Sequence, residues 1–158
     1  MNHSLKTGLC FGLTSAVITT LGLMVGLSSG TGSKLAVLGG ILTIAIADAF
    51  SDALGIHIAE ESEGKHTAKE VWESTGATFA SKLIFALTFI IPVLLFTLQT
   101  AIIVSIFWGL SALAALSYIL AKDEGNKPLK VITEHLFIAL LVIAATHYVG
   151  KWISSFFS

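Results

Sequence analysis

The sequence predicts an all-α polytopic membrane protein with five transmembrane helices. Hydrophobic residues make up 54% of the 158 residues and charged residues only 12%, and the mean hydropathy is +0.87. Apolar stretches of about 18 or more residues recur along the chain, and each is long enough to cross a bilayer of ~30 Å as a helix. Hydrophilic turns separate these stretches. A single transmembrane domain, residues 1–158, is expected at this length.

The first predicted helix covers residues 8–28. Its apolar run is longer than the core of a signal peptide, which has about 7–15 residues, so a retained helix is expected. Small residues recur along it at every fourth position in two sets: Gly8, Gly12 and Ala16, then Gly22, Gly26 and Gly30. Such ladders allow helices to approach closely. Packing within one chain and the seam of a dimer are both open interpretations.

The second predicted helix covers residues 34–58, with Ser33 as its N-cap. A short acidic segment, residues 59–76, follows and is the most polar part of the chain. Within it, the spacing of Thr67 and Glu70 fits a capping box at the start of a new helix. The segment is therefore expected to be partly helical and to lie in the cytoplasm.

Three more helices are predicted, over residues 77–97, 101–121 and 131–153. Pro92 is expected to kink the first of these because it lacks a backbone N–H and its ring clashes with the preceding turn. The hydrophilic run 122–130 separates the last two helices.

The distribution of lysines predicts the orientation. Five crossings place the two termini on opposite sides of the membrane. With the N-terminus inside, only Lys34 and Lys151 lie on the far side, and the remaining lysines are cytoplasmic: Lys6, Lys65, Lys69, Lys82, Lys122, Lys127 and Lys130. This excess follows the positive-inside rule. A compact chain without arginine fits the plasma membrane of a prokaryote.

Two aspartates in the second helix are the main candidate for function. Asp48 and Asp52 are one helical turn apart, so they share a face, and Ser51 flanks it. Carboxylates within a bilayer are costly, at about 2.5–3.5 kcal/mol each on insertion scales, and indicate function. Two adjacent carboxylates do not both ionise easily without a cation. Exchange of a divalent cation for protons is the chemistry that this pair suits.

More candidate metal ligands follow at the cytoplasmic end of the same helix. They are Glu60, Glu61, Glu63 and His66. Weaker candidates for the transport path are Ser15, Ser51 and His57. Carboxylate and imidazole ligands together suit first-row divalent ions such as Fe²⁺ or Mn²⁺. A solvated connector with no metal is the alternative interpretation of this segment.

Other functional classes fit less well. No nucleic-acid partner is expected because the chain has no basic patch. The single cysteine, Cys10, excludes an intrachain disulfide and a cysteine-based metal cluster. An intramembrane aspartyl protease needs its two aspartates on different helices, so no enzyme activity and no bound cofactor are expected. A non-transporting membrane protein, used for assembly or partner binding, and a proton-coupled carrier of small organic cations are the remaining alternatives. In the former, the aspartates would only fix packing through hydroxyl groups or His147.

Four segments resemble the vacuolar iron transporter family. They are Thr19–Leu23 (TTLGL), Ala49–Gly55 with the acidic run that follows, Gly76–Pro92, and Ala145–Gly150 (ATHYVG). The resemblance covers nearly the whole chain. It implies a homodimer in the lipid bilayer, with an ion path between the subunits. It also implies export of Fe²⁺ or Mn²⁺ from the cytosol in exchange for protons.

The chain departs from that family at the positions that matter most for the ion path. Ser15 stands where the family has an aspartate, and Ile44 and Asp52 stand where it has a glutamate and a methionine. Asp48 replaces a small residue. These departures predict a preference for a harder cation such as Mn²⁺, or a loss of transport.

Overall fold

The structure is a computed structural model that describes residues 3–157, and in this part of the chain every regular element is a helix. The helices are α1 (His3–Thr31), α2 (Lys34–Glu63), α3 (Ala68–Thr88), α4 (Ile90–Leu95), α5 (Leu98–Asp123) and α6 (Pro128–Phe157). Helices α3 and α4 form one apolar segment, so five segments are long and apolar enough to cross a membrane. The prediction of an all-α chain with five such helices is confirmed.

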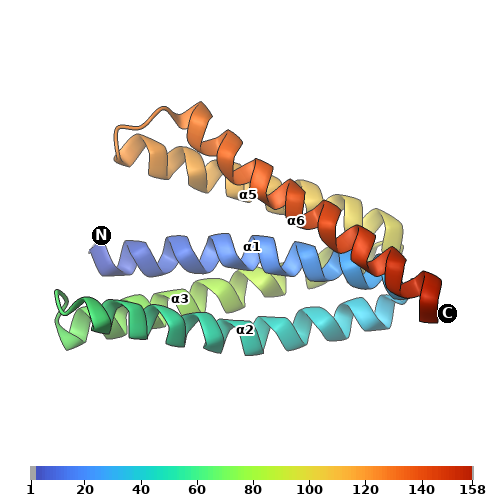
Figure 1. Ribbon diagram of the computed structural model, residues 1–158, viewed down its shortest axis with the longest axis horizontal. Helices are drawn as coiled ribbons and strands as arrows, with labels where there is room; N and C mark the ends of the chain where they lie inside the picture. Colours follow the sequence, from blue (N-terminus) through green and yellow to red (C-terminus); the bar gives the residue numbers. More distant parts are fainter. Residues whose placement is uncertain (1–2, 158) are drawn as a thin grey trace.

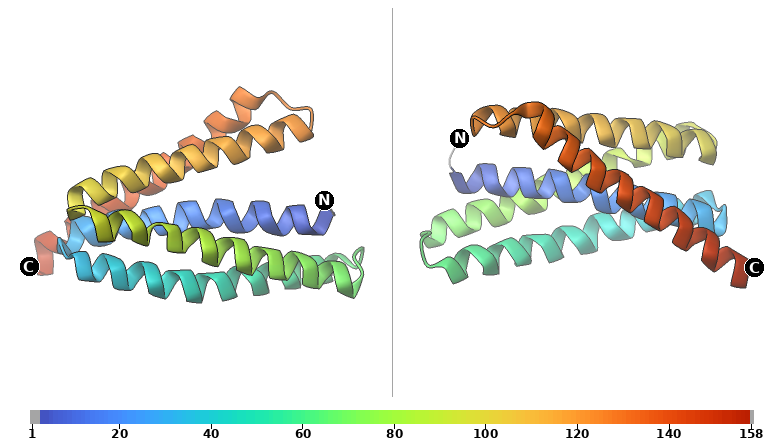
Figure 2. Two further views of the ribbon diagram at one scale, coloured as in Figure 1. Left: turned by 180° about the vertical axis from the view of Figure 1, so that it is seen from behind. Right: turned by 45° about the horizontal axis from the view of Figure 1, so that its top comes forward.

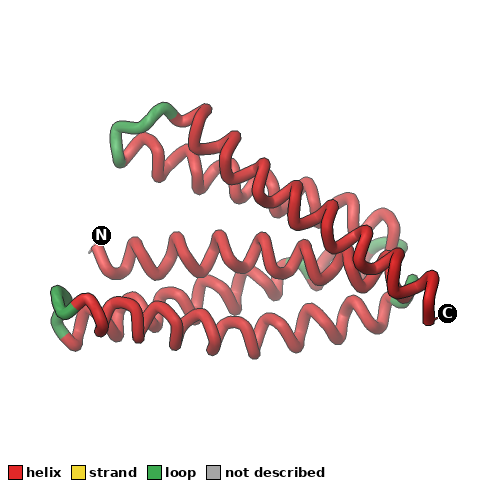
Figure 3. The backbone as a smooth tube through the Cα atoms, viewed as in Figure 1, coloured by secondary structure: helices red, strands yellow, loops and turns green. Residues whose placement is uncertain are grey.

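Helix α1 is the centre of the bundle. It contacts all four of the other long helices. Figure 1 shows α2 and α3 on one side of α1, and α5 and α6 on the other side. The loops gather at the two ends of the bundle (Figure 3), and the N- and C-termini lie at opposite ends (Figure 2). This arrangement is the one that an odd number of crossings requires.

The ends of α2 and α3 follow from local sequence. The Ser33 side chain accepts a hydrogen bond from the Ala36 N–H (3.2 Å) at the start of α2. Gly64 ends this helix with a φ of 63°, a conformation that glycine adopts without strain. The predicted capping box of Thr67 and Glu70 is present. Helix α2 ends later and α3 begins earlier than predicted, so only residues 64–67 of the acidic segment are non-helical.

The predicted kink appears as a break between α3 and α4. The interruption lies at Phe89, three residues before Pro92. The proline ring excludes the normal hydrogen bond to the carbonyl of Thr88, one turn earlier, which explains why the helix ends there.

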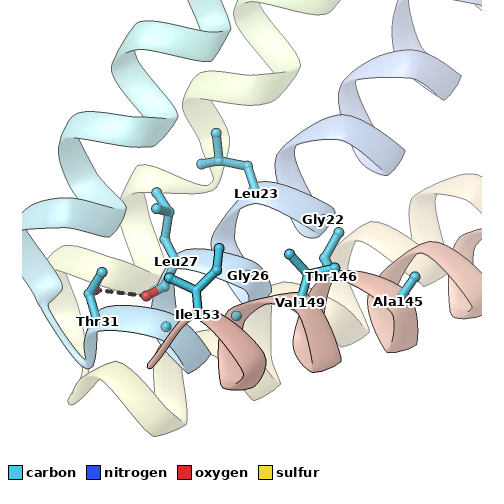
Figure 4. A pocket seen from close by; sticks show the side chains of 11 residues that line it. Gly22, Leu23, Gly26, Leu27, Thr31, Ala145, Thr146, Val149 and Ile153 are labelled. Carbon is cyan, nitrogen blue, oxygen red and sulfur yellow. Dashed lines mark hydrogen bonds between the residues drawn. The ribbon is translucent and has the colours of Figure 1, made fainter. Parts of the chain in front are cut away.

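The small residues of α1 pack against neighbouring helices of the same chain. Gly12 touches α3 so closely that a Cβ atom there would collide with Ser81 and with the Thr78 carbonyl. Gly26 faces α6, where Gly150 approaches its carbonyl oxygen. Figure 4 shows Gly26 of α1 and Thr146 of α6 beside an apolar cavity of about 400 Å³ between these two helices. Of the two interpretations of these ladders, packing within one chain is the one that the structure supports.

The interior of the bundle has an apolar part and a polar part. The core lies toward the end that holds the C-terminus and includes Leu21, Met24, Ile41, Phe89 and Leu113, all fully buried. Toward the other end, the interior between α1, α2 and α3 contains buried serines, threonines, a glutamate and a lysine. This polar interior holds the candidate site.

Candidate functional site: a buried lysine between two aspartates

Lys82 connects three helices at the centre of the polar interior. Its side chain on α3 is only 1% exposed. The ammonium nitrogen Nζ lies 2.5 Å from Oδ2 of Asp48 and forms a second ion pair with Asp52, both on α2. It also donates a hydrogen bond to Oγ of Ser15 on α1 (2.7 Å). The two aspartates therefore share a face, as their spacing predicts, and a lysine bridges them.

The antiparallel register of α2 and α3 explains this meeting. Because the two helices run in opposite directions, an earlier residue of α2 lies beside a later residue of α3. Glu60 lies beside Ser74, and Asp52 lies beside Lys82. The aspartates are one turn apart, so a single ammonium group on the facing helix reaches both. We name this arrangement of Ser15, Asp48, Asp52 and Lys82 the carboxylate–lysine cluster.

The carboxylate–lysine cluster carries one more carboxylate than ammonium group. With all three groups ionised, its net charge is −1. The Asp48 and Asp52 side chains are 24% and 18% exposed, so neither is fully hydrated. Among the described residues, Oδ2 of Asp48 has no polar partner besides the Lys82 ammonium group, which alone compensates its charge. Excess negative charge in such a place attracts either a proton or a cation.

A row of buried polar groups joins this cluster to the α2–α3 connection. On α3 the row contains Ser74, Thr78 and Ser81, all buried. The Ser74 hydroxyl donates a 2.6 Å hydrogen bond to the carboxylate of Glu60, which is only 6% exposed. Glu60 is therefore an interior group at one end of this row. Together these four residues form what we call the polar seam.

The other predicted ligands lie outside the seam. Glu61 and Glu63 are exposed, and Nε2 of His66 is 4.0 Å from the Glu63 carboxylate. Nδ1 of His57 is 2.9 Å from the Thr75 hydroxyl. Ser51 is exposed and takes no part in the cluster.

The hydrogen bond between His57 and Thr75 determines which ring nitrogen of His57 carries a proton. The Thr75 hydroxyl has a single proton, and it donates this proton to the Val71 carbonyl at 2.6 Å. It must then accept from Nδ1–H of His57, which leaves Nε2 of the imidazole free for another partner.

The six predicted metal ligands do not form one site. Within residues 3–157, no group of three or more histidine, cysteine, aspartate or glutamate side chains is arranged to hold a metal ion. Asp48 and Asp52 are the one pair that the fold brings together on a common cation, and that cation is Lys82. A metal ion at this pair would have to take the place of the ammonium group.

Two details of the sequence interpretation need correction. Lys82 was assigned to the cytoplasmic side, but it is buried within the bundle, so it does not count in the positive-inside comparison. Removing it still leaves six lysines against two. His147 does not contact the aspartates; its Nδ1 lies 2.6 Å from the Ser29 hydroxyl, beyond the apolar core.

A signal for Lys82 was present in the sequence. It is the single charged residue within the apolar range 77–97, and a lone charge in such a segment normally faces a partner inside the bundle.

Comparison of the chain with protein-family models and with curated protein sequences found no match. The resemblance to the vacuolar iron transporter family therefore rests on the four sequence motifs alone.

Proposed function

We propose that this protein carries divalent metal cations such as Fe²⁺ or Mn²⁺ across a membrane, out of the cytosol and in exchange for protons. The observation that supports this most is the uneven charge of the carboxylate–lysine cluster. Two carboxylates, Asp48 and Asp52, face one ammonium group inside a bundle of apolar helices. Their oxygens, with the hydroxyl of Ser15, are ligands of the kind that hard and borderline divalent ions prefer.

In this proposal, the transported cation reaches the carboxylate–lysine cluster along the polar seam. Its hydroxyl groups follow one face of α3 from the α2–α3 connection to Lys82, and the Glu60 carboxylate of α2 lies against the first of them, Ser74. Buried ionisable residues in membrane segments, such as Glu60, mark ion pathways and proton relays. In the predicted orientation the connection lies in the cytoplasm. Glu60 would then be the first interior carboxylate that an ion meets.

A homodimer is part of this proposal. Helix α2 exposes a complete row of small residues on its outer face: Gly39, Thr43, Ala47, Ser51, Gly55 and Ala59. Nothing lies within 4 Å of a Cβ atom built on Gly39 or Gly55, so a second helix can approach closely there. A second copy at this face would also shield the half-buried carboxylates from lipid. Disulfide crosslinking through Ser51→Cys, with Cys10→Ser to remove the native thiol, tests this arrangement.

The lysine bridge also favours a second candidate function. An ion-paired cluster that joins α1, α2 and α3 could serve only to fix their packing, in a membrane protein used for assembly. Replacing one aspartate separates the two candidates better than replacing both, because Asp52→Asn keeps the Lys82–Asp48 ion pair and hence the packing contact, but removes one of the two carboxylates a metal ion would need.

The test is metal uptake into proteoliposomes under an imposed pH gradient. Fe²⁺, Mn²⁺, Co²⁺ and Zn²⁺ are compared, with the Asp48→Asn/Asp52→Asn variant beside the unchanged protein. The proposal predicts gradient-dependent uptake that both the double variant and the single variant Asp52→Asn lose. The single variant keeps one carboxylate and one ammonium group, so it should stay folded and separates loss of transport from loss of folding. A folded protein that takes up none of these metals would favour the assembly function. Proton flux that organic cations alone elicit would favour a carrier of such cations.

A further inference from the structure

We propose that the ammonium group of Lys82 is a tethered occupant of the cation site, which a transported cation must displace from Asp48 and Asp52. This inference rests on the proposed function and adds a mechanism to it. Lys82 would then set the affinity of the site and make entry of the cation conditional on movement of one side chain.

The geometry places Lys82 in the position of a bound cation. Its Nζ lies 2.5 Å from Asp48, pairs with Asp52 and bonds to Ser15 at 2.7 Å. These are the oxygen atoms that a divalent ion would use. An ion bound between the two carboxylates would occupy the space that Nζ now fills, so the two cations exclude each other sterically.

The net charge of the cluster also disfavours a state in which Lys82 and a divalent ion are bound together. Two carboxylates and Lys82 sum to −1, and adding a divalent ion while Lys82 stays in place gives +1. Replacing Lys82 by the same ion gives zero. Two unit charges about 4 Å apart repel by about 4 kcal/mol at an effective dielectric constant of 20. A neutral cluster is therefore the favoured bound state, and it requires the ammonium group to leave.

The lysine side chain is suited to such movement. Its charge is at the end of a flexible four-carbon stem, whereas arginine would hold both carboxylates with a rigid fork. Its third partner, Ser15, lies on α1, the central helix of the bundle.

The first test is Mn²⁺ binding to the purified full-length protein in lipid nanodiscs. Lys82→Gln removes the competing charge and keeps the length of the side chain. Because the removed repulsion amounts to several kcal/mol, we expect Lys82→Gln to bind Mn²⁺ at least about tenfold more tightly than the unchanged protein. The matched control is Lys69→Gln, an 86% exposed lysine, whose loss should leave the affinity unchanged.

The second test needs no variant and remains decisive even when Lys82→Gln folds poorly. The unchanged protein is treated with a membrane-permeable amine-acylating reagent, and the modification of each lysine is followed by mass spectrometry. Lys82 should react slowly without Mn²⁺ and several times faster as Mn²⁺ saturates the site. The rates of Lys69 and Lys65 should stay constant.

The outcomes separate this inference from the proposed function. Binding and transport of Mn²⁺ by the unchanged protein, with Lys82 labelled at a constant rate, would overturn the displacement mechanism and leave the transport function standing. Equal or weaker binding by a folded Lys82→Gln variant would do the same. Absence of Mn²⁺ binding by both proteins, together with absence of uptake, would overturn the function itself.

Discussion

Charge counting at the carboxylate–lysine cluster predicts that its members differ strongly in their effects on stability. Lys82→Met leaves Asp48 and Asp52 facing each other without a cation. Asp52→Asn instead leaves one carboxylate and one ammonium group, and the net charge rises from −1 to zero. The lysine substitution should therefore be severe, and each single aspartate substitution should be mild.

The magnitudes follow from burial. Removing one partner of a buried ion pair costs about 3–5 kcal/mol because the remaining charge is uncompensated. Lys82 is 1% exposed, but the aspartates are 24% and 18% exposed and keep some hydration, so we expect about 3 kcal/mol, at the lower end of the range. Asp48→Asn or Asp52→Asn should cost about 1 kcal/mol or less, since the amide replaces one charge-assisted bond and the charges that remain are balanced.

The assay is the free energy of unfolding in mixed micelles, measured by titration with denaturing detergent. The triple variant Lys82→Met/Asp48→Asn/Asp52→Asn completes the comparison, and it should recover much of the stability lost by Lys82→Met alone because no ionised group remains. Equal losses for Lys82→Met and Asp52→Asn would refute the reasoning. So would a loss below about 1 kcal/mol for Lys82→Met, which is typical of an exposed ion pair.

Three further predictions concern the elements that hold the cluster in place. Gly150→Ala should destabilise the α1–α6 contact by about 1–3 kcal/mol, because its Cβ would collide with the Gly26 carbonyl oxygen; Gly55→Ala, where nothing is within 4 Å, is the matched control and should be neutral or stabilising in detergent-induced unfolding of the monomer. Thr67→Ala should remove the capping box of α3 and cost about 1 kcal/mol, and faster amide hydrogen exchange in the first turn of α3 would be its signature. Ser74→Ala should cost about 1–3 kcal/mol because it leaves the buried Glu60 carboxylate without its hydroxyl donor, whereas Ser62→Ala, on an exposed hydroxyl, should be silent in the same unfolding assay.

The sequence was sufficient to predict the all-α class and the number of membrane-length helices. Hydropathy alone located five membrane-length segments, and local chemistry located the Ser33 cap and the Thr67 capping box. The helix lengths were underestimated because polar residues such as Glu60 were assigned to a connector. Helix α2 continues through Glu63, since Glu60 faces the interior and is satisfied there by Ser74.

Only part of the candidate site, the pair Asp48 and Asp52, was predictable from the sequence. The shared face of Asp48 and Asp52 follows from helical spacing, which is a property of one segment. Their partner Lys82 depends on the register between α2 and α3, and no local pattern specifies that register. The same limit applies to Ser15, which the sequence suggested only through a family resemblance and which the structure places on Lys82.

The most direct test of the central claim is proton movement that a metal gradient drives. Proteoliposomes with a pH-sensitive dye inside would receive Mn²⁺ outside, with the unchanged protein and the Asp48→Asn/Asp52→Asn variant compared at equal, verified folding. Our account predicts a Mn²⁺-dependent change of internal pH that the double variant abolishes. An equal pH change with both proteins, or none with either, would contradict the assignment of Asp48 and Asp52 as the exchanging site.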